Sequence, residues 1–221
     1  MTSKSANSEI IGEVNNPKEN SIDAGAHEIE VEIADGGMTY IRVTDDGSGM
    51  SPEDLKLSVI RHATSKISSV ENIYHISSLG FRGEALPSIM SVSRATITTR
   101  RGEDVNGIAI DVVGGNVQEP QSVGAPEGTT VEVRELFYNV PARKKFLKSE
   151  RTESSRINSM VGKMALANPD IAFRLINNGR VVIETPGVRS SMVIWGKLPY
   201  SSKCVCPGFL IISFTMESGA D

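Results

Sequence analysis

The chain has 221 residues, of which 39% are hydrophobic and 23% are charged, and this composition excludes intrinsic disorder and a disulfide-stabilised miniprotein. Lys and Arg number 23 against 27 Asp and Glu, so the formal charge of −4 provides no global positive field for nucleic acid. Cys204 and Cys206 are too few for a disulfide framework or a complete zinc site. No apolar stretch approaches the ~20 residues of a membrane-spanning helix. The polar start also lacks the apolar run of a signal peptide, so we expect a cytoplasmic protein without a membrane partner.

Hydrophobic periodicity predicts a mixed α/β domain. Alternating apolar residues over 28–33 and 40–43 predict a β-hairpin, and Ser51 before Pro52 predicts the start of a helix that extends to about Arg61. Later elements should form a mixed sheet covered by helices on one side. After the first helix we expect a long Ser-rich loop over 62–80 and a short helix through Ile89. The later expected elements are strands over 95–100, 108–113 and 129–133, helices that begin at Pro141 and about Glu153, and a hairpin over 172–183 that turns at Asn178 and Gly179.

Asp45, Gly47 and Gly49 form a D-x-G-x-G motif at the end of the second predicted strand. A carboxylate at this place can accept a hydrogen bond from the amino group of a planar base, and glycines let the backbone approach a ligand. Asp is also common in plain turns at strand ends. The motif alone therefore leaves a base-binding site and a simple turn open.

A second motif is a glycine-bracketed segment that opens the short helix ending at Ile89. Backbone N–H groups at a helix N-terminus form an anion site suited to phosphates, although a plain turn fits the pattern equally well. The segment is not a Walker A loop, because no Gly-Lys-Ser/Thr ends it. It consists of Gly80, Phe81, Arg82, Gly83, Glu84, Ala85 and Leu86.

Two further polar groups have the chemistry of a triphosphate site. Asn20 and Asp23 are candidate oxygen ligands for Mg²⁺, while the alternative is a helix that ends at Gly25. The Ser-rich loop is either a closing lid or a solvated loop. It offers the hydroxyls of Thr64 and Ser65 and the ammonium group of Lys66.

Six motifs, in this order and spacing, resemble the MutL mismatch-repair proteins of the GHKL ATPase superfamily, which includes gyrase B, Hsp90 and histidine kinases. They are NSIDAGA, DDGSGM, RHATSKI, SLGFRGEAL, GTTVEV and LFYNVPARKKFL, and the resemblance covers about residues 20–186. GFRGEAL with FYNVPARKKFL distinguishes MutL from the other branches, including kinase-like ATPases. The resemblance implies an α/β two-layer sandwich in which helices cover a mixed, largely antiparallel sheet. It also divides the chain into a shortened, atypical segment over 1–19, an ATP-binding domain over 20–196 and an unmatched tail over 197–221.

The same resemblance assigns roles to individual residues. Asn20 would hold Mg²⁺ against ATP, Asp45 would bind the adenine amino group with Gly49 beside the base, and Thr129 would support the adenine site. The 64–66 side chains would lie near phosphate in a lid, and the 80–86 segment would donate N–H groups to the phosphates. In the family, ATP closes the lid and dimerises the N-terminal domains, which signals from a mismatch-recognition protein to strand-incision factors.

The sequence departs from the family pattern at the catalytic base. The family places a Glu four residues before the Mg²⁺ Asn, but here that position is Asn16, which cannot accept a proton usefully. Glu19 remains a candidate, although it is adjacent to Asn20 and would point about 100° away around a helix. The second-domain Lys that contacts the γ-phosphate is also missing from the sequence. We expect impaired ATP hydrolysis, as a truncated or rearranged coding sequence would produce.

A basic segment follows Pro141 in the predicted helix. Its cations can contact DNA phosphates without reading sequence, or they can belong to an exposed amphipathic helix. The first interpretation leaves an alternative function, a noncatalytic interaction or DNA-binding remnant of the same fold. The candidate DNA contacts are Arg143, Lys144, Lys145 and Lys148.

Overall fold

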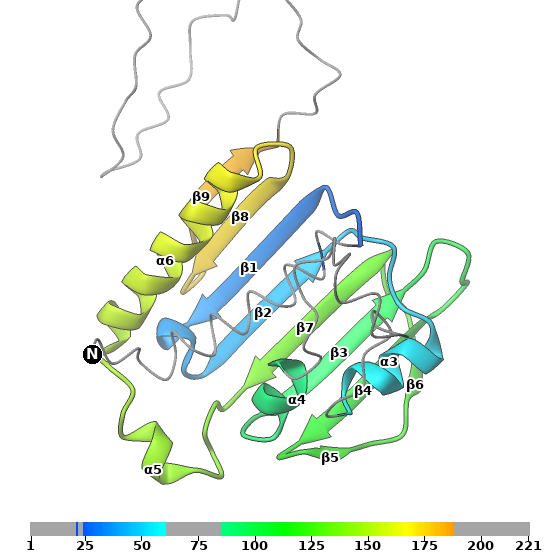
Figure 1. Ribbon diagram of the computed structural model, residues 1–221, viewed down its shortest axis with the longest axis horizontal. Helices are drawn as coiled ribbons and strands as arrows, with labels where there is room; N and C mark the ends of the chain where they lie inside the picture. The colour runs from blue at the N-terminus through cyan, green and yellow to red at the C-terminus, as the bar shows by residue number, and fades with distance from the viewer. Residues whose placement is uncertain (1–20, 22–23, 61–84, 188–221) are drawn as a thin grey trace, which may run out of the picture. The chain divides into compact units, whose positions relative to one another are not determined.

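The computed structural model describes residues 21, 24–60 and 85–187. In this part of the chain nine strands form one sheet in the order β5-β4-β3-β7-β2-β1-β8-β9, with β6 also paired to β4 (Figure 1). The β1–β8 pair is parallel and the other pairs are antiparallel, which confirms the predicted mixed, largely antiparallel sheet. The strands are β1 (Glu28–Ala34), β2 (Tyr40–Asp45), β3 (Arg94–Arg100), β4 (Gly107–Val113), β5 (Asn116–Val117), β6 (Gln121–Val123), β7 (Gly128–Arg134), β8 (Ala172–Asn177) and β9 (Arg180–Pro186).

Helices cover one face of the sheet, as predicted. Figure 1 shows α6 lying along the β1–β8–β9 half, while α3 and α4 lie on the same side over the half that contains β3 and β4. The helices are α3 (Pro52–Ser58), α4 (Ala85–Met90), α5 (Pro141–Lys144) and α6 (Glu150–Ala167), and a 3-10 turn, η1, spans Asp35–Gly37.

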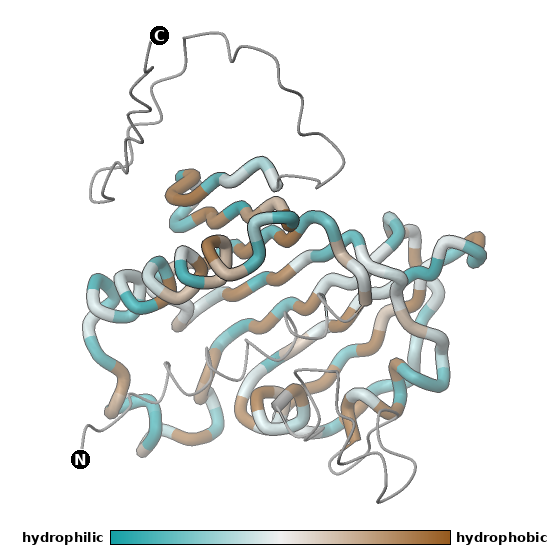
Figure 2. The backbone as a smooth tube through the Cα atoms, turned by 45° about the horizontal axis from the view of Figure 1, so that its top comes forward, coloured by the Kyte–Doolittle hydropathy of each residue, from teal (hydrophilic) through white to brown (hydrophobic). Residues whose placement is uncertain are grey.

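The core lies between the sheet and these helices because each strand presents every second side chain to them. Ile29 and Ile33 of β1 and Ile97 of β3 are fully buried, and they pack in one apolar cluster with Leu55 of α3 and Ile157 of α6. Burying a side chain of this size contributes about 1.5–3 kcal/mol. The alternation of brown and teal along the strands in Figure 2 follows this pattern.

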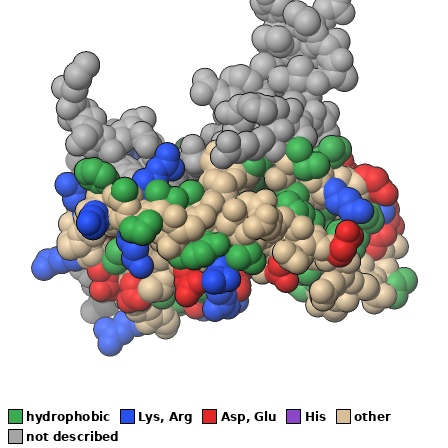
Figure 3. Space-filling view, turned by 90° about the horizontal axis from the view of Figure 1, so that it is seen from below, with side chains coloured by type: hydrophobic (Ala, Val, Ile, Leu, Met, Phe, Trp, Pro, Cys, Tyr) green, Lys and Arg blue, Asp and Glu red, His purple; other side chains and the backbone are tan. Residues whose placement is uncertain are grey.

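The opposite face of the sheet is polar and cross-linked by ion pairs. Glu30 of β1 accepts hydrogen bonds from Arg42 of β2 at 3.2 Å and from Arg174 of β8 at 3.3 Å, so one carboxylate joins three neighbouring strands. Figure 3 shows acidic and basic side chains next to one another along the lower side of the molecule. This arrangement leaves one face of the antiparallel sheet toward solvent, which is the usual outcome when helices cover only the other.

Three predicted helix boundaries need correction. α3 begins at Pro52, with the Ser51 hydroxyl accepting the Asp54 N–H, but it ends at Ser58 rather than near Arg61, because a tighter turn from Ile60 N to the Leu57 carbonyl closes it. The helix at Pro141 has only four residues. The last helix starts at Glu150 instead of 153, because the Ser149 hydroxyl caps the N–H of Thr152.

The hairpin turn between β1 and β2 also positions α6. Gly36 has a φ of +67°, and a Cβ at this position would lie 2.8 Å from the Glu150 carbonyl oxygen. The glycine therefore allows both the left-handed turn and the close approach of the α6 N-terminus. β5 and β6 were not predicted, since strands of two and three mostly exposed residues carry no alternating pattern.

Candidate nucleotide-binding site

Asp45 is the centre of the candidate site. It ends β2, pairs across the sheet with Thr129 of β7, and is only 9% exposed. Its Oδ2 accepts the Ser21 hydroxyl at 2.6 Å and its Oδ1 accepts the Gly47 N–H at 3.0 Å. Burial raises the pKa of the Asp45 carboxyl above its ordinary value, and these hydrogen bonds, with one from the Thr129 backbone, only partly oppose the shift. The site thus holds a buried carboxyl group whose two oxygens are both oriented by donors.

The glycines of the D-x-G-x-G motif let separate chain segments meet around this carboxyl group. A Cβ at Gly47 would lie 2.9 Å from the Ala24 Cβ. Gly49 has a φ of +68°, and a Cβ there would overlap the Arg100 carbonyl oxygen at the end of β3. Both glycines are therefore required for segments of the same chain to pack closely against each other. That they also let the backbone approach a ligand stays a prediction.

Thr129 belongs to a hydroxyl network that sequence reasoning missed. Its Oγ1 lies 3.1 Å from the Oγ1 of Thr99, which also donates to the Gly128 carbonyl at 3.1 Å and accepts the Met50 N–H at 2.9 Å. Thr99 is 1% exposed. The sequence did contain a signal for Thr99: it follows two apolar residues at the inward positions of β3, where another apolar residue is expected.

Ser21 is the other missed residue, although its motif was recognised. The Ala26 N–H donates to the Ser21 carbonyl at 3.0 Å, and Gly25 has a φ of +72°. This is the hydrogen bond and the conformation that a glycine adopts at a helix C-terminus. The turn leaves the Ser21 hydroxyl 2.6 Å from Asp45.

The structure brings together Asp45, Gly47, Gly49 and Thr129 of the predicted site. Leu86 is buried in the core at the start of α4, so its side chain serves packing, and only its backbone remains a candidate donor to phosphate. Ala85 begins the same helix. Other predicted site residues lie outside the described part of the chain: Glu19, Asn20, Asp23, Thr64, Ser65, Lys66, Gly80, Phe81, Arg82, Gly83 and Glu84, together with Asn16 and both domain boundaries.

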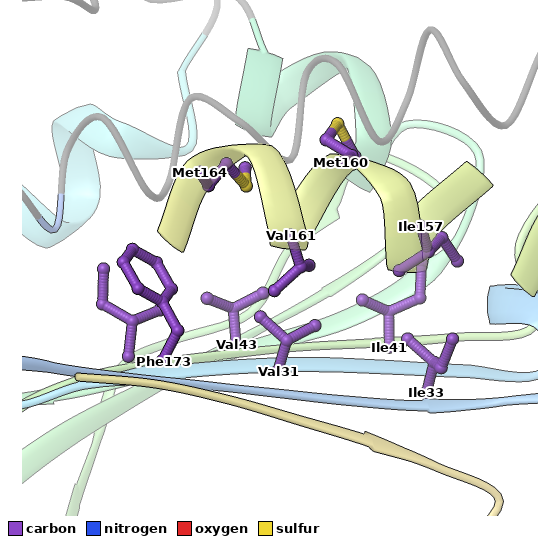
Figure 4. Close-up of a pocket in the computed structure, with 10 residues that line it drawn as sticks. Val31, Ile33, Ile41, Val43, Ile157, Met160, Val161, Met164 and Phe173 are labelled. Carbon is purple, nitrogen blue, oxygen red and sulfur yellow. The ribbon is translucent and has the colours of Figure 1, made fainter. Parts of the chain in front are cut away.

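An apolar cavity under α6 is distinct from this site. It is about 30 Å³ in volume and is enclosed by β1, β2, β8 and α6 (Figure 4). Asp45 does not line it. Among the described residues its walls carry no polar side chain that could read a base or a phosphate. Its walls are Ile29, Val31, Ile33, Ile41, Val43, Ile157, Met160, Val161, Met164 and Phe173.

The residues proposed for DNA contact lie at the other end of the sheet. β7 starts beside Asp45, and its far end leads toward α5. The strand has seven residues, so it is roughly 20 Å long at ~3.3 Å per residue. α5 ends at Lys144, so Lys145 caps it and Lys148 lies beyond it, which corrects the prediction of one continuous basic helix. Arg143, Lys144, Lys145 and Lys148 are all exposed, and none forms an ion pair with another described residue.

Neither a metal cluster nor a membrane-spanning helix occurs in the described ranges. No group of three or more His, Cys, Asp or Glu side chains there is placed to hold a metal ion. No helix there is long and apolar enough to cross a membrane. The expected Mg²⁺ site depends on Asn20, which the structure does not describe.

Comparison with known proteins identifies the family. The histidine kinase-, DNA gyrase B-, and HSP90-like ATPase family matches residues 14–132. The DNA mismatch repair protein MutL of Clostridium acetobutylicum is 54% identical over 167 residues, and MutL of Clostridium botulinum is 49% identical over 187 residues. The alignments cover 76% and 85% of this chain, and 27% of each relative.

A solved structure agrees with these relatives. The Aquifex aeolicus MutL ATPase domain complexed with ADP is 37% identical, with a TM-score of 0.61 over 78% of this chain and 61% of that chain. The family match, which spans more than half of the sequence, the relatives and the shared fold agree with the motifs around Asp45. The chain therefore belongs to the histidine kinase-, DNA gyrase B-, and HSP90-like ATPase family, and within it the chain is similar to the MutL DNA mismatch repair proteins and their ATPase domain.

Proposed function

We propose that this chain binds ATP at the Asp45 end of its sheet and acts as the nucleotide-responsive module of a mismatch-repair protein. The observation that carries the proposal is the buried Asp45 carboxyl group, held by Ser21 and Gly47 in a glycine-bracketed turn. A carboxylate fixed in this way is an acceptor for the adenine amino group. The Aquifex relative was solved with ADP, which supports a nucleotide as the ligand.

The remaining contacts of the proposed site follow from the family resemblance. Asn20 supplies an oxygen to Mg²⁺, a hard cation that screens the charge of the phosphates. Thr129, held by Thr99, borders the adenine site. The N–H groups of the 80–86 segment bind the phosphates, and the hydroxyls and ammonium group of residues 64–66 close over them.

We propose that hydrolysis by this chain is slow. Asn16 stands where the family has its general base, and an amide does not take a proton from the attacking water. A positioned general base typically contributes about 10²–10⁴-fold in rate. Nucleotide binding, lid closure and dimerisation of N-terminal domains do not require that proton transfer, so the chain can still switch between ATP-bound and ATP-free states.

Equilibrium binding of a fluorescent, nonhydrolysable ATP analogue tests the proposal. Saturable binding that needs Mg²⁺ and is displaced by ADP is the expected result. Asp45→Asn should abolish it, whereas Asp111→Asn, the same chemical change at an exposed position of β4, should not. A folded wild-type chain that binds no analogue, or an Asp45→Asn variant that binds it normally, would contradict the proposal.

The exposed basic segment favours a second role, contact with DNA. Its four cations, Arg143, Lys144, Lys145 and Lys148, have no acidic partner within ion-pair distance in the described ranges, so their charge is available to DNA phosphates. Such contacts are nonspecific in sequence and weaken steeply with salt. Through the family resemblance, the wider partners are a mismatch-recognition protein and strand-incision factors, with a second copy of the domain joining when ATP is bound.

A further inference from the structure

The hydroxyl of Ser21 makes the shortest side-chain hydrogen bond to the candidate base-reading carboxylate. The Ser21 Oγ lies 2.6 Å from the Asp45 Oδ2, and the two residues are 2% and 9% exposed. O–H to carboxylate bonds of this length belong to the strong, charge-assisted class. The bond joins two motifs that lie 24 residues apart in the sequence.

This bond fixes the orientation of the carboxylate plane. An Asp carboxylate turns easily about its last side-chain torsion, which has a broad energy minimum. In this chain one oxygen accepts the Gly47 N–H at 3.0 Å and the other accepts the Ser21 hydroxyl. Two donors on opposite oxygens allow one orientation only, and both favour the ionised, acceptor-only form of the group.

We propose that Ser21 is a positioning residue that gives the site its preference for a 6-amino purine over a 6-oxo purine. This inference rests on the proposed nucleotide function and deepens it. An oriented, ionised Asp45 accepts a hydrogen bond from the amino group of adenine. The same carboxylate repels the carbonyl oxygen of hypoxanthine or guanine, because two acceptors then face each other. Without the Ser21 donor, the carboxylate turns, and the contact with the amino group is lost.

A purely structural role for Ser21 makes a different prediction. Ser21 also accepts the Ala26 N–H through its carbonyl group, but that bond uses the backbone and survives any side-chain change. Loss of a buried hydroxyl alone lowers stability without distinguishing one purine from another. The selectivity ratio therefore separates the two roles, whereas a melting temperature does not.

The experiment compares ADP with inosine diphosphate, which has a 6-oxo group and an N1–H in place of the 6-amino group and the N1 acceptor. Binding of both is measured for the wild-type chain, Ser21→Ala, Ser21→Cys and Ser21→Thr. Ser21→Ala should weaken ADP binding about tenfold or more, as loss of a hydrogen bond to a charged group does. The same substitution should weaken inosine diphosphate binding far less. The ratio of the two affinities should therefore fall. Ser21→Cys keeps a side chain of similar size with a weaker donor, so its affinity ratio should lie between those of the wild-type chain and Ser21→Ala. Ser21→Thr keeps the hydroxyl and should retain the preference for ADP.

Ser93→Ala is the matched control. Ser93 is fully buried and donates to the Ile89 carbonyl at 2.8 Å, away from Asp45. The Ser93→Ala variant should be less stable than the wild-type chain and should keep the wild-type preference for ADP over inosine diphosphate. A folded Ser21→Ala or Ser21→Cys variant with wild-type selectivity would overturn the inference while leaving the proposed function intact. A folded wild-type chain that binds neither nucleotide would overturn both.

Discussion

Replacing Asp45 with Asn separates nucleotide binding from folding. The carboxyl group is buried and accepts one N–H and one O–H. An amide of the same shape can keep both bonds, because its oxygen still accepts from Gly47 and its NH₂ donates to a rotated Ser21 hydroxyl. Burial raises the pKa of Asp45, so the ionised form costs folding free energy at neutral pH, and Asn removes that cost. The unliganded variant should therefore melt no lower than the wild-type chain.

The liganded state should respond in the opposite way. At ADP about 100 times above Kd, binding stabilises the wild-type domain by about 2.7 kcal/mol, which raises Tm by roughly 5–11 °C for a chain of this size. Losing a charge-assisted hydrogen bond costs about 1.5–3 kcal/mol, and an amide N–H turned toward the adenine amino group adds a donor–donor conflict. At the same ADP concentration, the loss of about 1.5–3 kcal/mol leaves about 0.3–1.3 kcal/mol of stabilisation, so the shift should fall to about 1–5 °C, and the donor–donor conflict should lower it further.

Thermal unfolding with and without ADP measures both effects. Asp111→Asn on β4 is the control, because it makes the same charge change at an exposed carboxylate, which accepts the Thr96 hydroxyl at 2.6 Å. It should keep the full ADP shift. If Asp45→Asn kept a wild-type shift, the carboxylate would not be reading the base. If its unliganded Tm collapsed, Asp45 would be a structural residue.

Three further predictions follow from the same geometry. ADP affinity should fall about tenfold per pH unit once Asp45 protonates, at a higher pH than an ordinary Asp because burial raises its pKa. A raised folded-state pKa makes this protonation favour folding, so calorimetric titration should show lost binding in a chain that circular dichroism shows to be folded. Gly49→Ala should abolish binding and lower the free energy of unfolding, because its Cβ meets backbone. Gly179→Ala, which has a similar φ of +74° and no atom within 4 Å, should cost only about 1 kcal/mol. Replacing Lys144 and Lys145 with Glu should weaken DNA binding, reduce its salt dependence by about two phosphate contacts and leave ADP affinity unchanged; a normal salt slope would remove this segment from the DNA surface.

Most of the fold could be predicted because its patterns are local. Alternation of apolar residues gave β1, β2 and the later long strands, and the pairing of Ser51 with Pro52 gave the start of α3. The errors concern helix ends, which hydrogen bonds between residues three positions apart decide. The basic helix ends after four residues, and the separate helix predicted from about Glu153 begins at Glu150, with Ser149 as its N-cap. Propensity alone does not show where one helix gives way to the next.

The candidate site was predicted only in part, for a physical reason. A motif shows which residue types are present, but not which groups hold them. Asp45 was identified from its motif, whereas its partner Ser21 and the Thr99 hydroxyl behind Thr129 are set by contacts between distant segments. The contact between Thr99 and Thr129 follows from the antiparallel register of β3 against β7, and the contact between Ser21 and Asp45 joins segments 24 residues apart; no local pattern encodes either.

Mapping the nucleotide onto the folded chain tests the central claim most directly. Backbone amide chemical shifts, followed during a titration with ADP, report which residues meet the ligand. We predict saturable changes at Gly47, Gly49 and Thr129, around the Asp45 carboxylate. Changes confined to the apolar cavity at Ile157 and Met160, or no change in a folded chain, would contradict the assignment of the site.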